Sequence, residues 1–313
     1  MNTAPTVETR KPFTLSLVAF GFGIIGLAAN LAVSFGYGFL YPRVIEGQPE
    51  WVEALADVGV YFALLFPGAL FLQLLFREKP FAPFAERPGC PRFPFLFLPM
   101  AVGIGHFVSY FAERLFGDLM APYSQYTDPE TMYTSPAAIA IYFFSLCILP
   151  PLLEEYIYRG LLLKHLLPLG RTTAVIVSSL LFALSHISLS QTVFAFAMGV
   201  VIGVAYLRSG SMWYGVLIHL ITNLISFGIS YWGFAYGFYD ATEQFYGILS
   251  TLLFNAAFAG IAVYTVFRII DRNRNRAEGI PSSGGGAKWV FMNPLFYLFV
   301  FCYVALIVIY YVA

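Results

Sequence analysis

Six polar residues within apolar stretches of this sequence have the types and spacing of a catalytic site. They are Glu154, Glu155, Arg159, His186, His219 and Asn223. Ionisable side chains in apolar segments are costly to bury, so they mark functional sites by default. A carboxylate that faces a histidine can hold a water molecule and remove its proton, which is general acid–base chemistry. A glutamate and a histidine of this set that face each other could therefore activate water.

Helical spacing separates the roles of the two adjacent glutamates. Glu155 and Arg159 are four residues apart, so on a helix they share one face, with the glutamate on the favourable N-terminal side. Because arginine stays charged in any protein environment, it needs a partner, and Glu155 is predicted to be its counter-ion. Glu154 projects about 100° away around a helix of ~3.6 residues per turn. It is therefore free to face a cavity.

His219 and Asn223 are also four residues apart, which places two hydrogen-bond donors on one helix face. Such donors can stabilise the oxyanion of a tetrahedral intermediate. Together with an activated water, this arrangement suits hydrolysis of an amide bond. Taken alone, Asn223 has a simpler interpretation, because amide side chains commonly link neighbouring helices in membranes.

Composition places these residues in a membrane. Of the 313 residues, 59% are hydrophobic and 11% are charged, whereas soluble domains average about 25% charged residues. Seventeen basic and seventeen acidic residues cancel, which removes any general argument for nucleic-acid binding. A spanning helix needs about 20 mostly apolar residues, so we expect an all-α, polytopic transmembrane bundle of about nine spans, with eight also possible. The candidate spans are 14–40, 55–76, 94–116, 137–165, 172–188, 191–208, 211–231, 245–268 and 290–312.

The candidate residues agree in predicted depth. With a rise of ~1.5 Å per residue, Glu154 and Asn223 each lie about 18 Å from the inner ends of their spans, His186 about 21 Å and His219 about 12 Å. All four depths fall in the middle portion of a hydrocarbon core of about 30 Å. This agreement favours one site over scattered polar residues.

The lysines and arginines predict the orientation of the chain. With a cytoplasmic N-terminus and nine alternating spans, fourteen of the seventeen basic residues fall in cytoplasmic segments, as expected for membrane proteins. We divide the chain into N-terminal helices (1–136), a catalytic core (137–228) and C-terminal helices (229–313). The last part contains a basic cytoplasmic linker at 271–289. Short loops favour a bacterial plasma membrane over a eukaryotic endomembrane.

Three motifs in this order resemble the CPBP family, which comprises the type II CAAX prenyl proteases and the bacterial Abi-like intramembrane proteases. They are Glu154-Glu155-x-x-x-Arg159, Phe182-x-x-x-His186 and His219-x-x-x-Asn223. The resemblance implies a helical membrane endopeptidase in which Glu154 and His186 activate water. It implies that His219 and Asn223 stabilise the oxyanion. The substrate would be a prenylated tail, a leader peptide or a segment of a membrane protein.

Other interpretations remain open. Glu154, His186 and His219 could form a zinc site with two histidines and one glutamate, although the sequence has no H-E-x-x-H motif. We expect no cofactor and a metal-free glutamate mechanism. The polar residues could instead relay protons in an ion-coupled transporter, or serve only packing in an immunity or scaffold protein. The expected partners are the lipid bilayer and a peptide or membrane-protein substrate.

Overall fold

The computed structural model describes residues 12–86, 96–120, 133–186, 188–236, 248–249, 251–261 and 287–312. These ranges are mainly helical and contain no strand. Four helical segments are long and apolar enough to cross a membrane, namely Pro12–Ile45, Glu50–Phe76, Pro136–Leu169 and Gln191–Ser209. Shorter apolar helices occupy Phe97–Val108, Arg171–Leu184, Trp213–Gly228, Thr251–Ile261 and Pro294–Leu306. The chain is an all-α polytopic membrane protein, as the sequence predicts.

The predicted spans correspond to these helices with shifted ends. The first three spans are α1 (Pro12–Leu40), α2 (Glu50–Phe76) and α3 (Phe97–Met120). α1 continues into the π-helical turn η1 (Tyr41–Ile45), and the short 3-10 helix η2 (Ala82–Ala85) follows α2. The predicted eighth span is described only at residues 248–249 and 251–261, and residues 271–286 of the predicted linker lie outside the described residues. The predicted last span is divided into α11 (Ala287–Phe291) and α12 (Pro294–Val312). The cytoplasmic position of the N-terminus stays a prediction.

The fourth span is one continuous helix with irregular segments. It consists of α4 (Pro136–Phe143), η6 (Phe144–Ile148), α5 (Leu149–Glu155), η7 (Tyr156–Leu163), α6 (Lys164–Leu166) and η8 (Leu167–Leu169), of which η6 and η7 are π-helical. Ser135 caps its first turn by accepting a hydrogen bond from the Ala138 backbone N–H. The remaining helices of the core are α7 (Arg171–Leu184), α8 (Leu189–Ser209) and α9 (Trp213–Tyr236).

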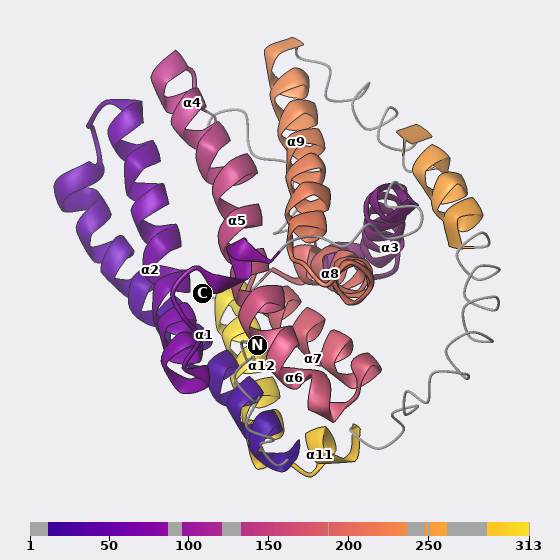
Figure 1. Ribbon diagram of the computed structural model, residues 1–313. Coiled ribbons are helices and arrows are strands. Elements are labelled where there is room, and N and C mark those ends of the chain that lie inside the picture. Colours follow the sequence, from indigo (N-terminus) through magenta and orange to yellow (C-terminus); the bar gives the residue numbers. More distant parts are fainter. Residues whose placement is uncertain are drawn as a thin grey trace.

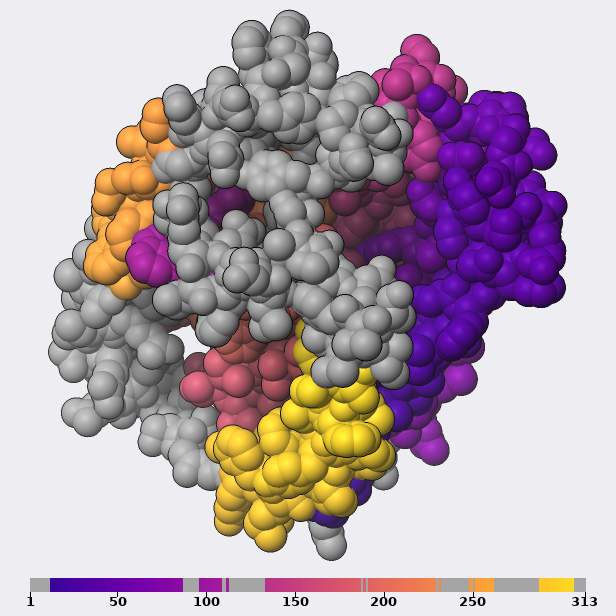
Figure 2. All heavy atoms as spheres, turned by 180° about the vertical axis from the view of Figure 1, so that it is seen from behind, coloured from indigo at the N-terminus to yellow at the C-terminus, as the bar shows by residue number. Residues whose placement is uncertain are grey.

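The fourth span lies at the centre of the helix arrangement. α4 and α5 stand between α2 on one side and α9 on the other, and α8 packs against both α7 and α3 (Figure 1). α1 packs against α2 and against α12, so the C-terminal helix lies beside the N-terminal helices (Figure 2). The irregular fourth span is therefore in contact with helices from both flanking parts of the chain.

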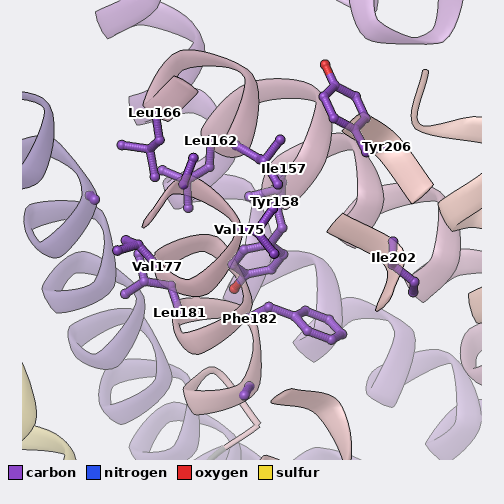
Figure 3. Packing of buried hydrophobic residues seen from close by; sticks show 14 of the residues in the cluster. Ile157, Tyr158, Leu162, Leu166, Val175, Val177, Leu181, Phe182, Ile202 and Tyr206 are labelled. Carbon is purple, nitrogen blue, oxygen red and sulfur yellow. The ribbon is translucent and has the colours of Figure 1, made fainter. Parts of the chain in front are cut away.

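The densest packing surrounds η7, α7 and α8. Tyr158 of η7 and Phe182 of α7 are both buried, and their rings meet edge to face with centroids 5.3 Å apart (Figure 3). Two glycines of α8 allow that helix to approach closely, because a Cβ at Gly199 would lie 3.1 Å from the Ser179 Cβ and one at Gly203 only 3.0 Å from Val175. Close approach through small residues is a common mode of helix packing in membranes.

Candidate active site

Glu154 and His186 line the same cavity, which has a volume of about 230 Å³. Glu154 lies near the end of α5, and His186 lies in the turn that follows α7. Glu154 is 6% exposed and His186 is partly buried. Helices from both flanking parts of the chain contribute to the cavity wall, including α1, α2 and α12. The cavity therefore brings together the two residues that the sequence predicts to activate water.

The end of α7 orients His186. The helix ends at Leu184, whereas the predicted span reached residue 188. The Phe182 carbonyl there accepts hydrogen bonds from the Ser185 hydroxyl (2.7 Å) and from Nδ1 of His186 (3.0 Å). Because a carbonyl can only accept, Nδ1 must carry the proton, which leaves the Nε2 lone pair of a neutral imidazole free to act as a base.

Glu154 is held by a tyrosine that lies outside the predicted core. The hydroxyl of Tyr61 in α2 donates a hydrogen bond to Oε1 of Glu154 at 2.7 Å. Oε2 of Glu154 is buried and has no hydrogen-bond partner among the described residues. It lies 3.7 Å from Nε2 of His219 in α9, an ion-pair distance that is too long for a hydrogen bond. One carboxylate oxygen is thus fixed, and the other is available for chemistry.

Glu155 is the counter-ion of Arg159, as the spacing predicts. Nη1 of Arg159 lies 3.0 Å from Oε1 of Glu155, and both side chains are completely buried. Nη2 of Arg159 donates to the Gly199 carbonyl of α8 at 3.1 Å. The same Glu155 oxygen lies 3.3 Å from Nδ1 of His219. His219 is therefore placed between two carboxylates, one near each ring nitrogen.

The ring of Phe182 contacts both histidines. It meets His186 edge to face at a centroid distance of 5.1 Å and His219 at 5.8 Å. The Arg159 guanidinium lies over the same ring, 4.7 Å from its centroid, which is cation–π geometry. Phe182 therefore fixes the positions of three of the polar groups without reacting itself.

Asn223 does not line the cavity. Its side-chain Nδ2 donates to the Leu146 carbonyl of the fourth span at 2.8 Å. The amide therefore links α9 to η6 at a point where the fourth span is π-helical. Its predicted role as an oxyanion donor stays a prediction.

The zinc alternative considered from the sequence uses Glu154, His186 and His219 as ligands. Among the described residues, no group of three histidine, cysteine, aspartate or glutamate side chains is arranged to hold a metal ion. Nδ1 of His186 bonds to a backbone carbonyl, and His219 lies near two carboxylates. The choice between a metal-free and a zinc mechanism stays a prediction.

Sequence reasoning missed Tyr61 and gave Phe182 no role beyond its place in a motif. Tyr61 is one of 21 tyrosines in a chain with 19% aromatic residues, so its position in a span carried no signal of its own. Its contact with Glu154 crosses 93 positions of sequence. Only the packing of α2 against the fourth span reveals it.

Comparisons with known proteins agree with these observations. Residues 136–225 match the family model described as type II CAAX prenyl endopeptidase Rce1-like. This match contains every site residue predicted from the sequence. Residues 136–225 of this chain are therefore similar to this family of CAAX prenyl endopeptidases.

One similar protein is the membrane-embedded CAAX protease MroQ of Staphylococcus aureus (strain USA300). It is 32% identical over 92 residues, which make up 27% of this chain and 37% of that protein. No solved structure matches the chain. The family match leaves the helices before residue 136 and after residue 225 without a family assignment.

Proposed function

We propose that this protein is an intramembrane endopeptidase of the CPBP type that cleaves a peptide bond with a water molecule activated by Glu154 and His186. The observation that carries the proposal is the shared cavity of these two side chains. A buried carboxylate with one free oxygen and a histidine with a free ring nitrogen provide two proton acceptors in the same cavity. The substrate is a peptide or a segment of a membrane protein.

In the proposed reaction, water attacks the carbonyl carbon of the scissile bond and transfers a proton to Oε2 of Glu154. Tyr61 holds the other oxygen of Glu154 during this step. The carbon–nitrogen bond then breaks, and the protonated Glu154 returns the proton to the leaving amine. Neutral His186 accepts a hydrogen bond from the same water at Nε2 and orients it.

His219 is the group proposed to stabilise the oxyanion. An imidazole can donate from both nitrogens only when it is protonated, and a carboxylate oxygen lies near each ring nitrogen of His219. A hydrogen-bond donor placed near the developing oxyanion stabilises the transition state more than the ground state. Asn223 is a proposed second donor, and it would have to release the Leu146 carbonyl to act in this way.

The test compares peptides released from bacterial membranes that contain the wild-type chain, Glu154→Gln or His186→Ala. Internally quenched reporters, one with a farnesylated CAAX tail and one with an unprenylated apolar sequence, are assayed in parallel. We expect each substitution to lower cleavage by about 10²–10⁴-fold, the usual contribution of general acid–base catalysis. Peptide products that persist unchanged in both variants would remove the basis of the proposal.

The mechanism is proposed to be metal-free. Activity should survive dialysis against a strong chelator and should not rise when zinc is added. Loss of activity on chelation, followed by recovery with zinc, would show that the protein is a metalloprotease. In that case Glu154, His186 and His219 would have to come closer together to bind the metal. We place the protein in the bacterial plasma membrane, the compartment suggested by its staphylococcal relative.

A further inference from the structure

The cavity beside Glu154 is largely apolar away from the catalytic residues. Its wall includes Phe22 and Leu27 of α1, Leu65 of α2, Leu184 of α7 and Phe299 of α12. These side chains come from helices that the family match does not cover, apart from α7. The general chemistry is thus provided by the core, whereas the shape of the cavity is set mainly by the flanking helices.

Gly26 of α1 leaves open space in this wall. A Cβ at Gly26 would meet no atom within 4 Å. The two other glycines of the wall behave differently, because a Cβ at Gly23 would lie 2.7 Å from Phe299 and one at Gly68 only 2.6 Å from Phe22. Gly23 and Gly68 are therefore needed for helix packing. Gly26 has no neighbour that requires a glycine, and its effect is to enlarge the cavity.

The volume selects the size of the occupant. A cavity of about 150 Å³ lined by apolar side chains is large enough to bind benzene, so a volume of about 230 Å³ accepts one large apolar side chain. It is smaller than the roughly 300–1,000 Å³ of pockets that enclose drug-sized ligands. A complete prenyl chain would therefore have to extend beyond this space.

Polar groups at the cavity suit a peptide. The amide side chains of Asn30 and Gln191 line the same space as Glu154 and His186. A peptide backbone in a membrane needs partners for its N–H and C=O groups, and carboxamides offer both donors and acceptors. Oδ1 of Asn30 also accepts a hydrogen bond from Ser34 at 3.4 Å, whereas a purely hydrocarbon occupant would offer neither amide a partner.

We propose that the cavity is a subsite for one large apolar side chain, such as Leu, Met or Phe, next to the scissile bond of the substrate, and that Gly26 sets its size. The inference rests on the proposed peptidase activity and adds a substrate class to it. Gly26 is a specificity-determining residue and not a catalytic one. A longer side chain at this position would occupy the place of the substrate side chain.

The test reads cleavage preference from a library of apolar peptides in detergent micelles, with cut positions identified by mass spectrometry. The wild-type chain is expected to prefer Leu, Met or Phe at one position beside the cut. Gly26→Leu should reduce cleavage at these residues relative to Ala by at least about tenfold, since a hydrophobic pocket discriminates roughly 10–200-fold per methylene-sized change. Gly26→Ala, whose Cβ has space, should give a smaller shift in the same direction.

Gly38→Leu is the matched control, because Gly38 lies on the same helix, is exposed and has open space where a Cβ would stand, with no atom within 4 Å. It should leave the preference unchanged. An identical preference in wild type, Gly26→Leu and Gly26→Ala would overturn the subsite. A selective loss of cleavage of the farnesylated reporter in Gly26→Leu, with no change among unprenylated peptides, would assign the cavity to a prenyl chain instead. Absence of any cut that depends on Glu154 would refute the peptidase activity itself.

Discussion

The side chain of Asn223 donates a hydrogen bond to the backbone carbonyl of Leu146 at 2.8 Å. This carbonyl has no normal partner in its own helix. The residues four and five positions later are Pro150 and Pro151, and proline has no backbone N–H to donate. An unpaired backbone group is expensive in a membrane. Asn223 therefore stabilises the π-helical segment η6 that precedes Glu154 in the fourth span.

The first prediction concerns this contact. Asn223→Ala should lower the free energy of unfolding by about 1 kcal/mol, because the partly buried Leu146 carbonyl loses its hydrogen bond. It should also lower kcat by misplacing Glu154. Restoring N–H groups with Pro150→Ala and Pro151→Ala should recover part of both losses. Unfolding in detergent and steady-state kinetics measure the two effects.

The proline replacements alone, with Asn223 intact, are the control for this experiment. If Asn223 acts only as an oxyanion donor, its replacement by alanine will reduce kcat at unchanged stability. In that case the added N–H groups will restore nothing. The pattern of rescue therefore distinguishes the bracing role from the catalytic one.

The second prediction concerns Tyr61. Tyr61→Phe removes the hydrogen bond to Oε1 of Glu154 and keeps the ring. Hydrogen bonds to charged groups contribute about 1.5–3 kcal/mol, so we expect kcat to fall at least about tenfold with little change in KM. Tyr37→Phe is the matched control, because Tyr37 donates to Asp57 at 3.1 Å and not to Glu154. Equal kinetics in both variants would show that Tyr61 does not position the carboxylate.

The sequence predicts much of this molecule because membrane insertion imposes strong patterns. Apolar runs identify the helices, and costly buried charges identify Glu154, Glu155 and Arg159. Helical spacing also identifies the Glu155–Arg159 ion pair, which the structure confirms at 3.0 Å. These features depend on residues close together in sequence or on the physics of the bilayer.

Long-range contacts could not be predicted in the same way. Tyr61 and Gly26 have ordinary residue types for transmembrane helices, and only the packing of α1 and α2 beside the fourth span gives them a place at the cavity. The contact of Asn223 with Leu146 required knowledge of which carbonyl lies opposite α9. Helical periodicity defines a face of a helix but not the neighbour that the face meets.

The third prediction concerns pH and the polar cluster at the end of the fourth span. Lys164 lies 3.2 Å from Glu86 and 2.9 Å from Glu78. Burial raises the pKa of Glu86 above its usual 4.5, and Lys164 offsets this effect only in part. Since the folded-state pKa exceeds the unfolded-state value, the contribution of Glu86 to stability is present below the unfolded-state pKa and is lost as pH rises through the raised pKa.

Glu86→Gln should therefore flatten the pH dependence of stability on the alkaline side of about pH 4.5. Thermal unfolding in detergent across this range, compared with the wild-type chain, measures the difference. The exposed Glu46→Gln serves as a control with an acidic residue outside the cluster. Parallel curves for wild type and Glu86→Gln would contradict the prediction.

The fourth prediction concerns the buried pair of Glu155 and Arg159. Glu155→Gln leaves the Arg159 charge without its counter-ion in a completely buried position, and removing one partner of a buried pair costs about 3–5 kcal/mol. Glu155→Gln combined with Arg159→Met should recover most of this stability, because no charge is then left unpaired. The stability of Glu155→Gln and of Glu155→Gln/Arg159→Met is measured in a Glu154→Gln background, so that peptide cleavage does not affect the result.

The Glu155→Gln/Arg159→Met variant with Glu154 intact should still have low activity, since His219 has lost the carboxylate next to its Nδ1. Full activity in that variant would mean that His219 needs no second carboxylate.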